Sequence, residues 1–456
     1  MEWNNYVVKL NVKSKEYDFN HPLNTFNTMA SSGTGFFISD RLILTCYHVV
    51  SYAINIEVVY KQSTNVNATI KHIFPDDDLA IISLEKPIDG SKFLDFKVIQ
   101  NTQVGSVHTI GYPMGSTTIK VTKGIISGFE GSLIQTDATV NPGNSGGPLV
   151  INEGGKYYVV GVNVSKLSGK LTEGTSYVVP IYRFIILTKS ITDNSPITMK
   201  KPELLFDFQK LIQDKLRMHV FKNHPKLIKQ DIGARITKIN PRYYLNRHLN
   251  EKDIIISIND CVVDSQGNVR FPFFPEKIPL DDIGVWFVAG DTLKVIVLDR
   301  ITQKIITKKI KLELIETNCM NFYGLPNSPS YFVENNGLIF SMITQEHIKQ
   351  IKKLELSFPD FIKIIQANLN QRDQFVVYLA DLNYAKLKNG FIKYPVGQII
   401  IEINDMKFSN YNEYMEIMKQ KVVKIKTSDN KEYYLDTPKP EKLVSKLRKY
   451  MVIYKN

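Results

Sequence analysis

The first 190 residues consist of short strand-like segments separated by turn-forming residues, and this pattern limits the fold more than any other feature. Segments such as INIEVVY (54–60), LAIISLE (79–85) and KYYVVGVNV (156–164) are rich in β-branched and aromatic residues, and Gly, Asn, Asp and Ser lie between them. Short strands with regular turn signals are typical of antiparallel sandwiches and barrels. We therefore expect a β-sandwich or β-barrel domain in this part of the chain.

The remaining residues predict further domains, because 456 residues are too many for one hydrophobic core. The polar segment 191–203, with two prolines, indicates a linker, and helical patterns follow at 203–216, 346–356 and 412–420. KDIIISINDCVV (252–263) and GQIIIEINDMKF (397–408) align without gaps, each as a strand ending in an Asn-Asp turn. We expect two copies of one α+β module; chance similarity between Ile-rich strands is the alternative.

The cysteine content and the N-terminal segment give expectations about the compartment. The three cysteines, Cys46, Cys261 and Cys319, are far apart and form no CxxC pair, which argues against a disulfide framework and for a reducing environment. The first residues alternate like a strand rather than like a secretion signal, and no apolar run approaches the roughly 18 residues of a membrane span. We therefore expect an intracellular protein, cytoplasmic or nuclear and not secreted, with no membrane partner.

The net charge of +12 is placed unevenly along the chain. Residues 1–195 hold 16 Lys and Arg and 16 Asp and Glu, so the whole excess lies in the C-terminal part. A solvated basic surface is the simpler interpretation, and weak attraction to acidic partners or nucleic acid is the alternative. Because no nucleic-acid-binding motif accompanies the charge, we do not expect nucleic acid as a partner.

Residues 135–150, QTDATVNPGNSGGPLV, surround one serine, Ser145, with glycines, asparagines and prolines. A nucleophilic serine needs an adjacent base and backbone N–H groups that point at the developing oxyanion. Glycine tolerates the strained backbone that such converging N–H groups require. The amides of Gly143 and Ser145, together with that of Asn144, are the candidate oxyanion hole.

A histidine and a carboxylate precede this serine in a suggestive order. His48 ends the apolar strand ILTCYHVV, and Asp78 stands immediately before the strand LAIISL; Asp76 and Asp77 are expected to be solvated turn residues. Taken singly, each element has an ordinary structural interpretation as a packed histidine, an exposed acidic turn or a glycine-rich loop. The order His48, Asp78, Ser145 within one β-rich domain is that of the two-barrel serine proteases, so we predict a catalytic triad.

The blocks GTGFFIS, ILTCYHVV, DDDLAIISLE and IQTDATVNPGNSGGPLV resemble those of the HtrA (Deg) family of trypsin-like serine proteases, and the whole chain is most similar to the plant-type Deg branch. The resemblance implies a mainly β fold. It would comprise a chymotrypsin-like double six-stranded antiparallel β-barrel (1–195), a first α+β PDZ domain (200–316), and a divergent second PDZ domain with a C-terminal basic helix (317–456).

The same resemblance implies a function. It predicts an ATP-independent serine endopeptidase that cleaves unfolded or damaged proteins, needs no cofactor or metal, and assembles as a homotrimer or homohexamer. The alternative from another class is a proteolytically idle PDZ scaffold or chaperone. Only Gly131, Ser132 and Leu133 stand where the family usually carries a longer sensor loop, which suggests constitutive activity or a different control.

Specificity residues are expected in both kinds of domain. In the peptidase domain a non-acidic pocket floor and apolar walls favour cleavage after small or medium aliphatic residues; the residues concerned are Thr139, Val162 and Val164. Family position implies that the PDZ peptide-binding loop lies at Leu216, Arg217, Met218 and His219. Cys46, beside His48, is expected to pack rather than to react.

Overall fold

The computed structural model describes residues 2–15, 28–100, 105–164, 175–192, 194–202, 204, 206–239, 244–314, 332–343, 376–382, 386–387 and 397–436. The chain forms two compact units, which we describe separately. The first extends to residue 315, apart from the short segment 15–29, and the second comprises that segment and residues 316–456.

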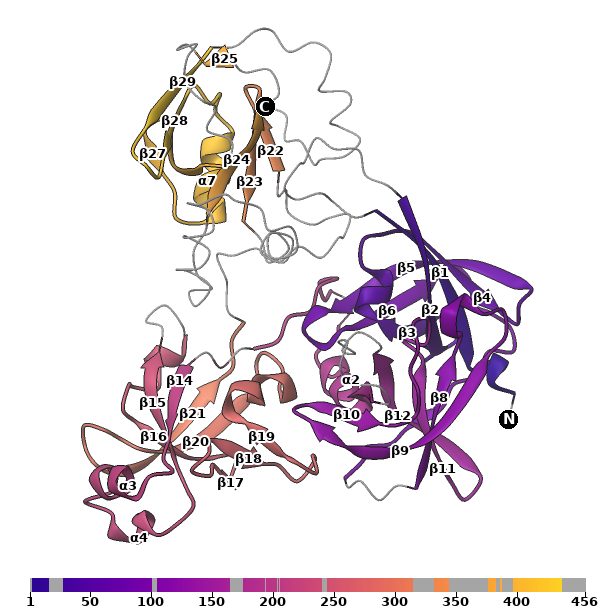
Figure 1. Cartoon of the computed structure of the whole chain (residues 1–456), viewed down its shortest axis with the longest axis horizontal. Helices are drawn as coiled ribbons and strands as arrows, with labels where there is room; N and C mark the ends of the chain where they lie inside the picture. Colours follow the sequence, from indigo (N-terminus) through magenta and orange to yellow (C-terminus); the bar gives the residue numbers. More distant parts are fainter. Residues whose placement is uncertain are drawn as a thin grey trace. The chain divides into compact units, whose positions relative to one another are not determined.

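Six antiparallel strands close into a first barrel in the order β1–β2–β3–β6–β5–β4 (Figure 1). Residues at every second position, such as Leu10 and Val12 on the first strand and Val58 on the fourth, are buried in its interior, as the alternation of a half-buried strand requires. The strands are β1 (Val7–Lys15), β2 (Thr28–Phe37), β3 (Leu42–Cys46), β4 (Ala53–Tyr60), β5 (Thr64–Phe74) and β6 (Leu79–Leu84).

A second barrel follows in the order β11–β8–β9–β10–β13–β12, and the pairing of β11 with β12 closes it. Its strands are β8 (Ser106–Gly111), β9 (Lys120–Glu130), β10 (Leu133–Thr136), β11 (Pro148–Glu153), β12 (Lys156–Val164) and β13 (Ser176–Pro180), with β7 (Asp95–Phe96) added parallel to β12. Helix α1 (Tyr47–Val50) follows β3, and α2 (Ile181–Thr188) follows β13. The prediction of a mainly β fold with two six-stranded barrels is therefore confirmed. Gly131 and Ser132 form a two-residue turn between β9 and β10.

A third sheet in the same unit has the order β14–β15–β16–β20–β21, with β17 paired to β16. The helix predicted at 203–216 is wrong over its first half, because Phe206 and Phe208 alternate with polar residues in a strand and a helix starts only at Asp214. The elements are β14 (Phe206–Lys210), α3 (Asp214–Val220), α4 (Pro225–Ile228), β15 (Ala234–Ile239), β16 (Ile254–Ile258), β17 (Cys261–Val262), β18 (Asn268–Arg270), β19 (Lys277–Pro279), β20 (Thr292–Leu298) and β21 (Ile305–Lys311).

Short 3-10 helices complete the first unit, and one of them carries aromatic packing. The ring of Trp286 lies 6.0 Å from that of Tyr182 on α2, and Phe274 lies 5.0 Å from Phe129 on β9. These contacts bury aromatic surface between the third sheet's connections and the second barrel. The 3-10 helices are η1 (Trp3–Asn5), η2 (Pro75–Asp77), η3 (Pro113–Gly115), η4 (Tyr244–Arg247) and η5 (Leu280–Trp286).

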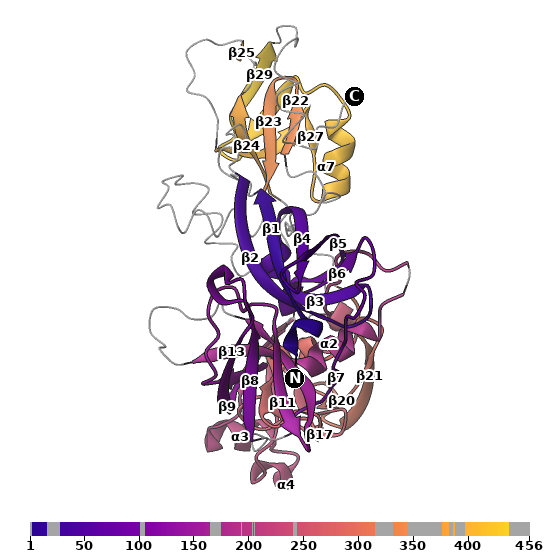
Figure 2. The same cartoon turned by 90° about the vertical axis from the view of Figure 1, so that its right-hand side faces the viewer.

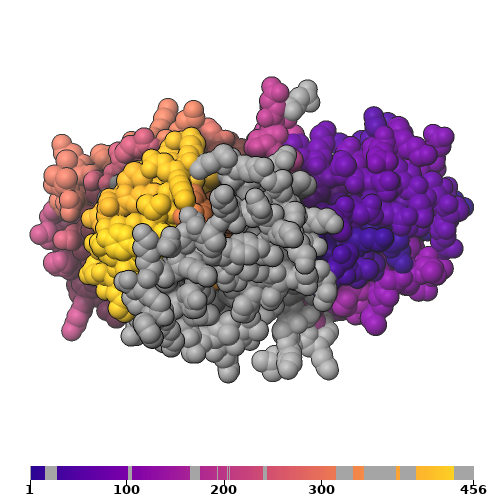
Figure 3. Space-filling view, turned by 90° about the horizontal axis from the view of Figure 1, so that it is seen from above, coloured from indigo at the N-terminus to yellow at the C-terminus, as the bar shows by residue number. Residues whose placement is uncertain are grey.

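The second unit contains a sheet in the order β22–β23–β24–β26–β28–β29–β25 with helix α7 beside it (Figure 2). Its described residues 397–436 form a continuous surface, coloured yellow in Figure 3. The predicted helix at 412–420 is confirmed as α7 (Tyr411–Met418), whose Tyr414 is fully buried, whereas the predicted helix at 346–356 and the C-terminal basic helix lie outside the described residues. The strands are β22 (Phe332–Asn335), β23 (Leu338–Met342), β24 (Val377–Leu382), β25 (Lys386–Leu387), β26 (Ile399–Ile403), β27 (Met406–Lys407), β28 (Lys424–Thr427) and β29 (Glu432–Asp436).

The internal repeat seen in the sequence is confirmed by two matching hairpins. In β16–β17 the turn residues Asn259 and Asp260 both have positive φ, and Lys294 Nζ lies 2.6 Å from Asp260 Oδ1. In β26–β27 the turn Asn404–Asp405 has the same backbone sign, and its aspartate lies 2.7 Å from Lys424 Nζ. The assignment of these two modules as PDZ domains, and the exact domain boundaries, stay predictions. Within the described ranges, no helix combines the length and apolar character needed to cross a membrane.

Candidate active site

His48 and Asp78 are held together by three hydrogen bonds at one end of the first barrel. His48 Nδ1 lies 2.6 Å from Asp78 Oδ2, the backbone N–H of His48 donates to Asp78 Oδ1 at 2.8 Å, and the N–H of Tyr47 donates to the Asp78 carbonyl at 2.9 Å. Their side chains keep only 19% and 25% of their surface exposed, respectively. The carboxylate therefore fixes both the position and the ring orientation of the imidazole.

Asp78 reaches this position through an uncommon backbone conformation. It follows the 3-10 helix η2 and adopts the left-handed region, with φ 53°. Asp is one of the few non-glycine residues that enter this region, at a cost that the surrounding structure must offset. The sharp turn lets the chain end β5, present the carboxylate to His48, and enter β6 within a few residues.

The loop that carries Ser145 packs against β2 and against the end of β3, the strand that leads into helix α1 and His48. Ser145 is 3% exposed, and its carbonyl accepts a hydrogen bond from the N–H of Thr34 at 2.9 Å. The N–H of Gly146 and the thiol of Cys46 both donate to the carbonyl of Asn163, at 2.9 Å and 3.2 Å. One acceptor on β12 thus connects the residue after the serine to the residue two before the histidine.

Glycine is required next to the serine because the backbone there lies very close to the backbone of β2 and β3. Gly146 has φ 84°, and a Cβ atom there would lie 2.2 Å from the carbonyl oxygen of Thr34 and 2.9 Å from the backbone nitrogen of Cys46. L-residues rarely adopt this conformation, and real Cβ atoms do not approach backbone so closely. The glycines of the loop, noted in the sequence as permissive, are therefore sterically required.

The peptide groups before Ser145 are oriented by Thr34 and by Met114. The Thr34 hydroxyl donates to the Gly143 carbonyl at 2.6 Å and accepts from the N–H of Tyr112 at 3.0 Å. The N–H of Met114 donates to the Pro142 carbonyl at 2.6 Å, so the N–H of Gly143, which lies in the same trans peptide, points the opposite way. The N–H of Asn144 is used inside the turn by the Asn141 carbonyl, at 2.9 Å.

Thr34 and Asn163 were not identified by the sequence as functional residues. Both are fully buried, and both orient backbone groups around the serine rather than present a reactive group. Thr34 stands between two glycines in GTGFFIS, and Asn163 is a polar residue within the apolar strand VVGVNV; these polar interruptions are the only sequence signal. A buried polar side chain needs a hydrogen-bonding partner, so a polar residue within an apolar strand indicates a structural hydrogen bond.

The carboxylates around Asp78 differ from expectation at one position. Asp76 is exposed as predicted, but Asp77, expected to be a solvated turn residue, is 3% exposed. Arg183 and Lys201 surround it, and these two cations explain why the carboxylate tolerates burial.

The cysteine beside the site is buried, as expected. Burial, with a contribution from the nearby Asp78 carboxylate, raises the pKa of the Cys46 thiol well above its usual range. A protonated buried thiol is a poor nucleophile. Potential ligand atoms of Cys46, His48 and Asp78 lie within 4.8 Å of one another, but the imidazole and carboxylate are already hydrogen-bonded too closely for an ion between them.

The proposed specificity residues differ in their exposure to solvent. Thr139 is exposed, and its carbonyl accepts hydrogen bonds from the hydroxyls of Thr109 and Thr122. Val162 and Val164 are buried on β12, at 0% and 6% exposure. Their role in binding a substrate side chain stays a prediction.

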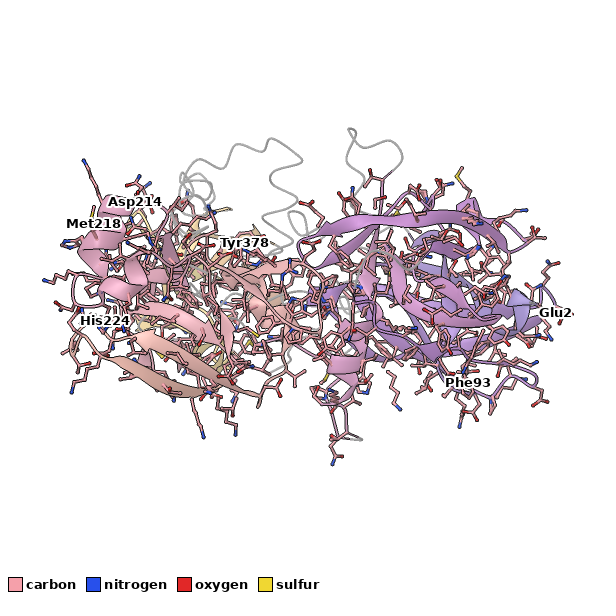
Figure 4. All side chains as sticks on the ribbon, turned by 90° about the horizontal axis from the view of Figure 1, so that it is seen from below. Glu2, Phe93, Asp214, Met218, His224 and Tyr378 are labelled. Atoms are coloured by element: carbon pink, nitrogen blue, oxygen red, sulfur yellow. The ribbon has the colours of Figure 1, made fainter. Side chains whose placement is uncertain are left out.

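The predicted peptide-binding residues lie in helix α3 rather than in a loop (Figure 4). Met218 is 51% exposed, but Arg217 is buried, and its guanidinium donates to five backbone carbonyls between Leu211 and Ile232. Those hydrogen bonds occupy the donors that a peptide carboxylate would need. Arg217 therefore stabilises the irregular segment between β14 and β15, and the assignment of the four residues to peptide binding stays a prediction.

The two barrels, with a histidine–aspartate pair on one and a serine–glycine loop on the other, define a trypsin-like serine peptidase domain. The family model described as "Trypsin-like peptidase domain" matches residues 33–162. Protease Do-like 13 of Arabidopsis thaliana is 29% identical over 364 residues, covering 76% of this chain and 70% of that protein. Protease Do-like 2, chloroplastic, of the same plant is 30% identical over 283 residues, 59% of this chain and 44% of that protein.

Among solved structures, "HtrA-type protease AlgW with tripeptide" has a TM-score of 0.50 at 21% identity and covers 68% of this chain and 93% of that one; it supports the fold. Apart from protease Do-like 13, the chain spans about half the length of the first curated relatives that it matches. The chain carries a trypsin-like peptidase domain and is similar to the HtrA (Deg) proteases, which supports the resemblance that its sequence blocks predicted.

The expected cytoplasmic or nuclear location is wrong. Curated relatives of the chain are named as mitochondrial, chloroplastic or periplasmic proteins. The expectation depended on the spacing of the cysteines, of which Cys46 and Cys261 are free thiols in the described part of the chain. The thiol of Cys46 serves packing and a hydrogen bond and carries no information about the compartment.

Proposed function

We propose that this endopeptidase cleaves unfolded or damaged proteins without ATP, by an acyl-enzyme mechanism in which Ser145 is the nucleophile, His48 the general base and Asp78 the residue that orients the base. The observation that carries the proposal is the 2.6 Å contact between His48 Nδ1 and Asp78 Oδ2. It leaves Nε2 of a neutral imidazole available as a base. The buried loop of Ser145 is linked through Asn163 to Cys46, at the end of the strand that leads into His48, and this supports the assignment.

In the proposed reaction His48 accepts the proton of the Ser145 hydroxyl while its oxygen attacks the scissile carbonyl. The amides of Gly143 and Ser145 donate to the oxyanion, and the orientation that Met114 gives to the Pro142–Gly143 peptide supports this role for Gly143. His48 then gives the proton to the leaving amine. Water hydrolyses the acyl-enzyme with His48 again as base, and no metal or cofactor takes part in any step.

The substrate class and the assembly state are part of the proposal. Relatives named as Do-like proteases and a fold neighbour with a bound tripeptide support a polypeptide substrate. We propose a homotrimer or homohexamer, with the two α+β modules binding substrate or mediating assembly. Cleavage after small or medium aliphatic residues is proposed from the apolar Val162 and Val164 and the uncharged Thr139.

A fluorophosphonate probe tests the proposal directly, because it reacts only with an activated serine. The purified chain should incorporate one probe per active site at Ser145 and should cleave unfolded casein. Ser145→Ala should remove labelling and lower casein turnover by roughly 10³-fold or more, and Asp78→Asn should lower turnover by about 10⁴-fold. If the parent neither labels nor cleaves at any assembly state measured by light scattering, the chain is an idle scaffold or chaperone.

A further inference from the structure

The residue directly before the proposed triad carboxylate is a second aspartate with different surroundings. Asp77 is 3% exposed, whereas Asp76 is exposed and Asp78 faces His48. A buried carboxylate needs cationic or hydrogen-bonding partners, since burial without them costs several kcal/mol. The partners of Asp77 therefore show which other segments of the chain hold this turn.

Two cations from distant parts of the chain meet at Asp77. Lys201 Nζ lies 2.6 Å from Asp77 Oδ1, and Arg183, on helix α2, forms an ion pair with the same oxygen. Both cations are buried, at 6% and 4% exposure. Arg183 also donates to the hydroxyl of Ser132, in the two-residue turn between β9 and β10, at 2.9 Å. The Asp77 cluster (Asp77, Arg183 and Lys201) thus connects η2 with the second barrel.

Lys201 belongs to the segment that the sequence indicated as a linker, and this segment is joined to the end of β5. The N–H of Ile73 donates to the Ile197 carbonyl at 2.7 Å, and the N–H of Met199 donates to the Ile73 carbonyl at 2.9 Å, in a parallel bridge. His72 Nδ1 lies 3.1 Å from the Pro196 carbonyl. The segment 196–201 therefore runs along the residues that lead directly into η2 and Asp78.

The Asp77 cluster does not resemble a device for stability. Burial, which outweighs the attraction of Asp77, lowers the pKa of Lys201 to about 8. Buried ion clusters are often no more stable than apolar residues of similar size. Apolar residues of similar size would stabilise the turn about as well, so stability alone does not explain why three charged residues are buried here.

The backbone conformation of Asp78 offers an explanation for these charges. Its left-handed conformation, with φ 53°, persists only if neighbouring contacts fix it. Its N–H donates to the Pro75 carbonyl within the turn, and its carboxylate and carbonyl are occupied by His48 and Tyr47. The side chain of Asp77 anchors the turn to Lys201, and so does Asp76, whose Oδ2 accepts from the N–H of Lys201 at 3.3 Å and whose carbonyl accepts from Lys201 Nζ at 3.4 Å.

We propose that Lys201 and Arg183 are positioning residues that act through Asp77 on Asp78, so that segment 196–201 is part of what keeps the triad in order. The inference rests on the proposed function, because it assigns a role relative to the triad. The proposal predicts that a substitution in segment 196–201 alters the reactivity of Ser145 although this segment does not contact the substrate.

Lys201→Met tests the inference in the full-length chain, because methionine keeps the length of the side chain and removes the charge. Asp77 retains Arg183, so we expect the variant to fold. Its second-order rate of phosphonylation should fall roughly 10- to 100-fold, as for a misplacement of about 1 Å. The kcat for a peptide substrate should fall by the same factor, while KM should change by less than about twofold. Lys200→Met, an exposed neighbour in the same segment, is the matched control and should match the parent.

A second pair of variants changes the carboxylate side of the cluster. Asp77→Asn leaves two buried cations facing an amide and should reduce the phosphonylation rate at least as much as Lys201→Met. Asp76→Asn should not, because its amide oxygen can still accept the N–H of Lys201 that donates to Asp76 Oδ2 at 3.3 Å. Melting temperatures separate the two explanations. A purely structural role lowers Tm and the number of titratable sites but not the rate per remaining site.

Each outcome decides the inference. If Lys201→Met reacts at the parent rate per site, the proposal is overturned even though the proposed function stands. If that variant does not fold, Lys201→Gln, which keeps a hydrogen bond to Asp77 without the charge, decides by the same rate, and parent-level reactivity overturns the proposal. A parent protein that does not react with the probe refutes the proposed function instead.

Discussion

Replacing Thr34 by valine should damage the active-site loop without leaving a cavity. The hydroxyl of Thr34 donates to the Gly143 carbonyl and accepts from the N–H of Tyr112, at 2.6 Å and 3.0 Å. Valine has nearly the same shape, so the change removes both hydrogen bonds and leaves two backbone groups without partners. An unsatisfied buried group costs about 1–3 kcal/mol; Gly143 is only partly buried, so we expect a total loss of about 3 kcal/mol.

Denaturant unfolding followed by tryptophan fluorescence measures this loss. The chain has two tryptophans, Trp3 in the first unit's barrel region and Trp286 in η5. In a Ser145→Ala, Trp286→Phe background autolysis is absent and Trp3 alone reports, and its ring lies 5.0 Å from that of Tyr157 on β12. Thr34→Val should lower the urea midpoint with an unchanged slope.

Thr45→Val is the control, because it removes a single hydrogen bond, from the Thr45 hydroxyl to the Thr34 carbonyl at 2.7 Å. It should cost about 1–2 kcal/mol, or half the effect. With Ser145 restored, Thr34→Val should also slow phosphonylation, since the Gly143–Asn144 peptide before Ser145 keeps only the hydrogen bond from its N–H to the Asn141 carbonyl. A stability loss below about 1 kcal/mol, or equal losses in the two variants, would refute the hydrogen-bond account of this loop.

Three other changes have equally definite outcomes. Gly146→Ala should abolish phosphonylation and lower Tm, since its Cβ would meet the Thr34 carbonyl at 2.2 Å, whereas Gly154→Ala, with open space around it, should cost only about 1 kcal/mol. Arg217→Met should destabilise the third sheet's region by about 4 kcal/mol or more, seen in Trp286 fluorescence, because it strips a charged donor from several carbonyls. The pKa of Lys201 is lowered from 10.5 to about 8 on folding, so the unfolded chain binds the proton more tightly between these values. The stability of the parent relative to Lys201→Met should therefore rise by about 3 kcal/mol from pH 8 to pH 10.5; no rise would contradict the burial of this ammonium.

The sequence predicted the barrels and the triad candidates because both depend on local patterns. Strand alternation and turn residues determine the barrels, and His48, Asp78 and Ser145 each stand at the end of an apolar segment or in a glycine-rich loop. A local pattern, however, could not distinguish Asp77 from Asp76. Which carboxylate is buried depends on Arg183 and Lys201, which approach from more than a hundred residues away.

Local sequence patterns could not place residues whose surroundings are set by distant backbone. Phe206 and Phe208 fit a helical pattern in isolation, but pairing with β15 draws them into a strand. Arginine is usually exposed, but the guanidinium of Arg217 is buried because it donates hydrogen bonds to backbone carbonyls of the irregular segment between β14 and β15. Thr34 was overlooked for the same reason, because its partners are main-chain atoms far along the sequence.

An endopeptidase that binds extended chains can also cut other copies of itself, and a connection between domains is a usual place for such nicking. In this chain the backbone at 196–201 is already engaged, because Ile73 uses both its N–H and its carbonyl on it. Another molecule could cleave there only after the end of β5 had separated from it. A nick between residues 196 and 201 would therefore mark molecules that had already lost the order of Asp78, so self-digestion at this site would remove spent enzyme and spare working copies.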